Sequence, residues 1–135
     1  MQSVVLNERL EIIGPRIFRN SKIKKITVPR SVTKIECWAF ENCKDLKEIV
    51  FEEGSKLEKI GWSCFKNSGL EEITLPKALK NVDYGAFEKC GNLKTIYVKD
   101  GCKANLLLAE VPDSTKVGPL SETMVGGVRV WGLRE

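Results

Sequence analysis

Ile35-Glu36-Cys37-Trp38-Ala39-Phe40 is one of four versions of the same six-residue stretch. The phenylalanine that ends each version recurs after 22, 25 and 22 residues. A period in this range is typical of solenoids, in which every coil packs only against its neighbours. Such a fold offers a broad surface and seldom an enclosed reaction site. The other three versions are Ile13–Phe18, Ile60–Phe65 and Val82–Phe87.

Each unit also contains a segment in which apolar residues alternate with variable ones. In the first complete unit, Ile26 and Val28 are predicted to point inward while Thr27 points outward, as the alternation of a β-strand requires. Pro29 and Pro76 directly follow two of these segments and mark their ends, because proline cannot donate to a strand ladder. The predicted strands are Val4–Leu6, Ile26–Val28, Ile49–Phe51, Ile73–Leu75 and Ile96–Val98.

The second half of each unit carries the phenylalanine. We expect these rings to line up as one spine through successive coils, because no single coil can bury its own apolar face. An asparagine such as Asn42 stands two positions later in three units, where it is expected to satisfy backbone groups in a tight turn. The spine would consist of Phe18, Phe40, Phe65 and Phe87.

These columns resemble the leucine-rich repeats of the BspA-like family, whose pattern is I-x-x-x-A-F-x-x-C-x-x-L-x-x-I-x-L-P. Ile35 to Phe51 and Val82 to Val98 follow it closely, and the resemblance extends from about Val4 to Asp100. It implies a leucine-rich-repeat solenoid of about four to five coils, mostly strands and loops, with a short parallel β-sheet on one face. Family members are surface antigens of host-associated bacteria and parasitic protozoa, so the resemblance also implies binding of other proteins, including host matrix proteins.

The end of the chain lacks the repeat. We expect the repeats to occupy residues 1–102 and a capping segment to occupy residues 103–135, because an uncovered last strand exposes apolar surface and unpaired backbone. Ala104 to Glu110 is predicted to form a short helix that docks on the last coil. Val125-Gly126-Gly127-Val128 predicts a hairpin with a two-residue turn. The alternative to a cap is a flexible linker or stalk.

Charge and hydropathy argue against two classes of partner. The net charge of +4 is spread along the chain without a basic block, so nucleic-acid binding is not expected. The longest strongly apolar run, Leu106 to Ala109, is too short to span a bilayer, and the first ten residues do not form a secretory signal. The acids Glu36, Glu41, Asp83 and Glu88 are expected to be solvated, with no paired-carboxylate site.

The sequence contains no histidine, which removes histidine-based catalysis and histidine-ligated metals. The five cysteines lack C-x-x-C spacing, so we expect no metal site, no cofactor and no catalytic residue. Cys43 and Cys90 lie two coils apart, about 10 Å, which is too far for a disulfide. We expect these thiols and Cys64 to be small core residues, with Cys102 the most exposed. A partial disulfide set or a reactive thiol is the alternative.

The outward strand positions are the candidate partner-binding residues. Tyr97 is the strongest single anchor, since aromatic side chains dominate interface hot spots. Trp38, Trp62 and Tyr84 lie on the second half of the units, where they either pack between coils or form an aromatic strip on an outer edge. The candidates on the sheet are Lys25, Thr27, Glu48, Val50, Glu72, Thr74, Thr95 and Tyr97.

Together these features predict a non-enzymatic, monomeric protein-binding module: an adhesin-like surface antigen or a fragment of one, which binds through the sheet face and adjoining loops. A structural spacer or display section of a longer repeat protein and an intracellular interaction scaffold are the alternatives. A cysteine hydrolase is a third class, which the lack of histidine disfavours. The resemblance implies a cell-surface or extracellular location, whereas the absence of a signal or anchor in these residues leaves a cytoplasmic one open.

Overall fold

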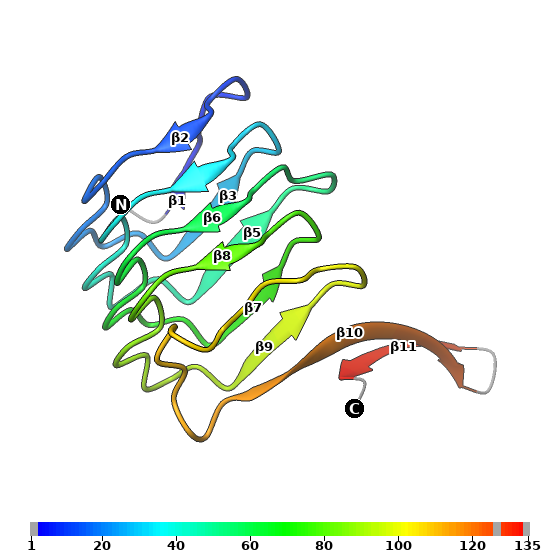
Figure 1. Cartoon of the computed structure of the whole chain (residues 1–135). Helices are drawn as coiled ribbons and strands as arrows, with labels where there is room; N and C mark the ends of the chain where they lie inside the picture. The colour runs from blue at the N-terminus through cyan, green and yellow to red at the C-terminus, as the bar shows by residue number, and fades with distance from the viewer. Residues whose placement is uncertain (1–2, 126–127, 134–135) are drawn as a thin grey trace.

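The computed structural model describes residues 3–125 and 128–133 and shows a stack of coils that forms a solenoid (Figure 1). Each coil passes through a strand on one face, a turn, a two-residue strand on the other face and a second turn. The described residues contain no helix. The prediction of a β-solenoid is therefore confirmed.

One set of strands lies side by side along one face, which we call the sheet face. β1 pairs with β3 and β3 with β5, all in parallel, and β7 pairs in parallel with β9. No hydrogen-bonded ladder of the described residues joins β5 to β7, so the face consists of two sheets. These strands are β1 (Ser3–Val4), β3 (Lys25–Val28), β5 (Glu48–Phe51), β7 (Glu72–Leu75) and β9 (Thr95–Val98).

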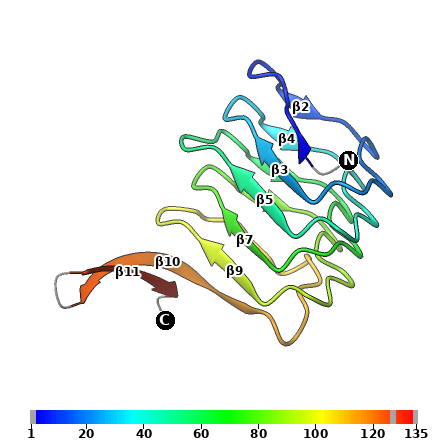
Figure 2. The same cartoon turned by 180° about the vertical axis from the view of Figure 1, so that it is seen from behind.

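A second parallel sheet covers the opposite side of the coils, as the two views in Figures 1 and 2 show. The sequence predicted a sheet on one face only. Each strand has two residues, of which the second, such as Ile35, is buried. Two residues are too few for a period-2 pattern to be recognised in the sequence. The strands are β2 (Ile12–Ile13), β4 (Lys34–Ile35), β6 (Lys59–Ile60) and β8 (Asn81–Val82).

The phenylalanine spine is present as predicted. The ring centroids of Phe18, Phe40, Phe65 and Phe87 are 5.2, 5.4 and 5.7 Å apart in succession, with interplanar angles of 13°, 9° and 8°. The last three rings are fully buried, whereas Phe18, at the first coil, is only partly buried. Offset stacking at such distances adds to the free energy gained by burial.

The asparagines do something different from what was expected. Their side chains bond to one another: Asn42 Nδ2 donates to Asn20 Oδ1 at 3.0 Å, and Asn67 Nδ2 donates to Asn42 Oδ1 at 2.8 Å. All three have φ values near +60°, a left-handed conformation that asparagine tolerates better than most residues. Lys89 takes the same conformation in the next coil but cannot continue the ladder.

The predicted helix at Ala104 to Glu110 is wrong. The segment continues the coil: Asn105 forms a parallel bridge with Asn81, and the Ala109 carbonyl accepts a hydrogen bond of 2.9 Å from the N–H of Phe87. A helix would have closed the backbone bonds of this segment within itself and left the N–H groups of the preceding coil unpaired. Buried backbone donors need partners, which favours the extended path.

The chain then adds a strand rung that the sequence analysis missed. The first residues of β10 (Lys116–Val125) pair in parallel with β9, from Lys116 opposite Thr95 to Pro119 opposite Val98. The apolar alternation is absent there because glycine and proline follow Val117. Backbone pairing of the coils therefore extends beyond residue 102.

The remainder of β10 forms the predicted hairpin with β11 (Val128–Leu133). The two strands are antiparallel, with Val125 opposite Val128, and the Gly-Gly turn itself lies outside the described residues. Figures 1 and 2 show that the hairpin extends sideways beyond the stack. The role of residues 103–135 as a cap stays a prediction.

Candidate partner-binding surface

The eight candidate residues share one face and form two columns. None of them is buried, whereas their inward neighbours, such as Ile26 and Ile73, are. The strand register brings each column into line: Lys25 lies opposite Glu48, and Thr74 lies opposite Tyr97. Their role in binding stays a prediction. The columns are Lys25, Glu48, Glu72 and Thr95, and Thr27, Val50, Thr74 and Tyr97.

The charges of the first column are unevenly compensated. Lys25 Nζ lies 3.2 Å from Glu48 Oε1, and both side chains are more than half exposed, so the pair contributes little to stability. Glu72 has no ion-pair partner in the part of the chain that the structure describes. Its carboxylate is therefore available to a cationic side chain of a partner.

Tyr97 has an unusual setting in the second column. Thr74 lies opposite it on one side, and Gly118 of the added rung lies opposite it on the other. Since glycine has no side chain, the rung beyond Tyr97 contributes only backbone next to the ring. This setting leaves the ring half-exposed, as an aromatic anchor for a partner requires.

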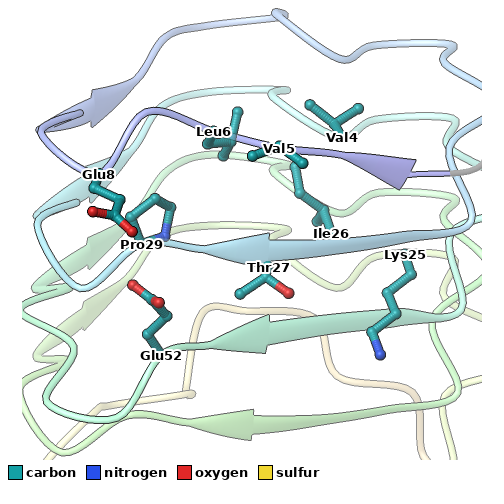
Figure 3. A pocket seen from close by; sticks show the side chains of 9 residues that line it. All are labelled: Val4, Val5, Leu6, Glu8, Lys25, Ile26, Thr27, Pro29 and Glu52. Carbon is teal, nitrogen blue, oxygen red and sulfur yellow. The ribbon is translucent and has the colours of Figure 1, made fainter.

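A groove of about 300 Å³ opens on the sheet face between β1 and β3 (Figure 3). Its polar groups are separated: the carboxylates of Glu8 and Glu52 flank Pro29 at one end, and Lys25 lies at the other, with Thr27 between them. A second groove, of about 160 Å³, lies two rungs further on, between β5 and β7 around Pro76. The two grooves are lined by corresponding positions of the repeat.

A proline follows the strand at each of these two grooves. At the β3–β5 and β7–β9 boundaries, the residue after the strand is Glu52 or Lys99, whose N–H donates to the preceding rung at 3.1 and 3.2 Å. Pro29 and Pro76 occupy the same column and have no N–H to donate. Among the described residues, the β1–β3 ladder covers two residue pairs, and no ladder joins β5 to β7. The two prolines were the sequence signal that one hydrogen bond between strands is missing at each groove.

Trp38, Trp62 and Tyr84 each follow a strand of the second sheet. Trp62 is 56% exposed and Tyr84 54%, which favours the strip interpretation over packing between coils. Their carbonyls accept hydrogen bonds of 2.9 and 3.0 Å from the preceding coil, as does that of Leu108 at 2.9 Å, so the three occupy one column. Trp38 is half-buried, and the Arg16 guanidinium lies 4.4 Å from its ring centroid. We call Trp62, Tyr84 and Leu108 the aromatic edge.

All five cysteines are free thiols. Cys43 and Cys90 are buried, and their sulfur atoms donate to the carbonyls of Phe18 and Phe65 at 2.9 and 3.0 Å. Burial raises the pKa of Cys43 to about 11 and also raises the pKa of Cys64 and Cys90. Protonated, inaccessible thiols are poor nucleophiles, so these three fit the core role that was expected.

Cys102 and Cys37 are half-buried and the other three thiols are buried, so Cys102 is one of the two more accessible cysteines. Burial raises the pKa of Cys102 as well, with its Sγ 3.7 Å from the carbonyl of Leu79.

The acids are also less solvated than expected. Glu41 is only 8% exposed, with its Oε1 2.8 Å from Arg19 Nε, close enough for an ion pair but not aligned for a hydrogen bond. Asp83 is half-buried and lies 3.6 Å from Lys59 Nζ. Among the described residues no group of three or more cysteine or acidic side chains could hold a metal.

Comparisons with known proteins agree with this architecture. The pneumococcal vaccine antigen PcpA shares 30% identity with a TM-score of 0.68, over 71% of this chain and 26% of that one. A leucine-rich repeat protein from Bacteroides capillosus shares 28% identity with a TM-score of 0.60, over 72% of this chain and 75% of that one. The T. pallidum leucine-rich repeat protein, 22% identical with a TM-score of 0.52 over 86% of this chain and 72% of that one, supports the fold alone.

This chain thus spans about a quarter of PcpA. No curated protein sequence matches it. No helix of the described residues is long and apolar enough to cross a membrane. Residues 1–104 match the BspA type leucine rich repeat region in six copies. The chain therefore belongs to the BspA-type leucine-rich-repeat family.

Proposed function

We propose that this chain is a non-enzymatic module that binds a partner protein on its sheet face. The observation that carries the proposal is the pair of outward columns, in which eight unburied side chains lie over four strands. Such a surface suits binding by shape and scattered polar contacts, in which a few anchors supply most of the affinity. The raised thiol pKa values and the lack of histidine support a role without bond chemistry.

Three parts of the face have separate roles in the proposed complex. Tyr97 is the aromatic anchor, because one neighbouring rung presents only Gly118 to it. Glu72 accepts a cationic side chain of the partner, since it has no ion pair among the described residues. The grooves at Pro29 and Pro76 receive side chains of the partner between the strands.

We further propose that the partner is a host matrix protein and that the chain works as an adhesin-like surface antigen or a fragment of one, at the cell surface or outside the cell. PcpA, which shares 30% identity, is described as a vaccine antigen, and this supports the proposal. The competing roles are a spacer section of a longer array and an intracellular scaffold. Neither requires the sheet face to bind matrix proteins.

Surface plasmon resonance over immobilised fibronectin, laminin and fibrillar collagen tests the proposal. We expect the wild-type chain to bind at least one of them, and we expect Tyr97→Ala combined with Glu72→Lys to weaken binding about tenfold or more. Lys80→Ala is the matched control, because Lys80 is exposed and lies away from both columns. Absence of binding by the wild-type chain, or equal binding by the double variant, would contradict the proposal and favour the competing roles.

A further inference from the structure

The aromatic edge lies apart from the sheet face and has no role in the function proposed above. Trp62 follows β6 and Tyr84 follows β8, so both leave the second sheet at the same point of successive coils. Leu107, beside Leu108, is 84% exposed, and Leu108 is 58% exposed. Half of the exposed large apolar side chains of the described residues thus gather in this one place. A clustered patch of this kind marks an interaction site, whereas scattered exposed residues do not.

The edge also offers hydrogen-bond donors without partners. Neither the indole Nε1–H of Trp62 nor the hydroxyl of Tyr84 bonds to any described residue. Aromatic faces that each carry a donor match a ligand with apolar rings and free carbonyl oxygens. The polyproline II conformation has this character, because its backbone makes no internal hydrogen bonds and proline has no N–H.

The spacing of the coils fits that conformation. Residues i and i+3 of a polyproline II helix lie on the same side, about 9 Å apart along its axis. Two rungs of the solenoid are about 10 Å apart. A segment laid along the column would therefore place one residue on Trp62 and the third residue after it on Leu108, with the hydroxyl of Tyr84 facing a carbonyl between them.

Features at both ends of the aromatic edge also suit a ligand in the polyproline II conformation. Next to Leu107 and Leu108 lies a groove of about 230 Å³, whose wall includes Asp83 and which can take a larger side chain. At the other end, Arg16 already stacks on Trp38 at 4.4 Å, which shows that this side of the coils accepts a cation on an aromatic face.

We propose that the aromatic edge binds a proline-rich segment of a partner protein in the polyproline II conformation. Recognition comes from stacking of prolyl rings on Trp62 and Tyr84 and from donation by both side chains to the carbonyls of the segment. The aromatic edge and the sheet face would then be two separate sites, on different sides of one rigid stack.

Isothermal titration calorimetry with decaproline tests this site. We expect the wild-type chain to bind decaproline and not a ten-residue glycine-serine peptide, which has the same length but lacks the rings. Trp62→Ala is expected to weaken binding about tenfold or more, since stacking area is lost. Tyr84→Phe keeps the ring and loses only the donor, so its effect should be smaller but measurable. Both residues are more than half exposed, which makes folding insensitive to these changes.

Tyr97→Ala separates this proposal from the previous one. It alters only the sheet face, so it should leave decaproline binding unchanged while it weakens binding of matrix protein. Equal binding of decaproline by wild type and Trp62→Ala, or no binding at millimolar peptide, would overturn the proposal. So would sedimentation analysis in which the wild-type chain dimerises and Trp62→Ala does not, because the edge would then be a contact between two copies.

Discussion

The phenylalanine and asparagine columns run through the same turns of the same coils, yet different forces hold them together. The phenylalanine rings are 5.2 to 5.7 Å apart, and three of the four are completely buried. The asparagine amides are exposed or half-exposed and bond to one another at 3.0 and 2.8 Å. Burial of apolar surface contributes more to folding than an exposed hydrogen bond, whose net value is small. The comparison indicates that the spine supplies stability and that the ladder fixes the shape of the turns.

The largest effect is expected in the middle of the spine. Phe65→Ala removes a fully buried ring that contacts a phenylalanine on each side, so we expect the free energy of unfolding to fall by about 3–5 kcal/mol. Chemical denaturation followed by circular dichroism measures it. Phe18→Ala is the matched control, because this ring is only partly buried and has one stacked neighbour. Equal losses in the two variants would mean that stacking along the spine does not determine stability.

A smaller loss is expected in the ladder. Asn42→Ala removes the one residue that both donates and accepts along the column, and it places alanine at φ 59°. Together these changes should cost about 1–2 kcal/mol. Asn42→Gly separates the two causes, since glycine adopts this φ freely but cannot form the ladder. If Asn42→Gly matches the wild type in chemical denaturation, the ladder bonds contribute nothing and only the turn conformation matters.

The buried thiols add a dependence on pH. Because burial raises the pKa of Cys43 from 9.0 to about 11, the folded state holds the proton more tightly than the unfolded state. The stability that this provides is complete below pH 9 and is lost as the pH rises towards 11. We expect Cys43→Ala to lose less stability than the wild type between pH 9 and pH 11 in parallel denaturation curves. Parallel pH profiles for the two proteins would show that other groups govern alkaline unfolding.

The two columns also show which features of the fold could be predicted from the sequence alone. Repeated apolar positions predicted the spine, and alternation predicted the outward side chains from Lys25 to Tyr97, because both signals depend on burial over several coils. The strands β2, β4, β6 and β8 of the second sheet were too short to give a period. The rung at Lys116 lacks the apolar pattern, and its partner strand β9 specifies it through backbone bonds. The grooves and the asparagine ladder depend on contacts between coils, which a single repeat does not reveal.

The smallest expected effect is a gain in stability at the end of the ladder. Lys89 has φ 59°, as the asparagines do, but its ammonium group cannot accept or relay an amide hydrogen bond. In Lys89→Asn the new amide could donate to the Oδ1 of Asn67, and the left-handed conformation would be better tolerated. We expect the free energy of unfolding to rise by about 0.5–1 kcal/mol, measured by chemical denaturation. Lys89→Gly relieves the backbone without forming the bond, so a gain confined to Lys89→Asn would assign the effect to the ladder. A loss of stability in Lys89→Asn would instead mean that the ladder ends at Asn67 because the fourth coil cannot accept a further amide.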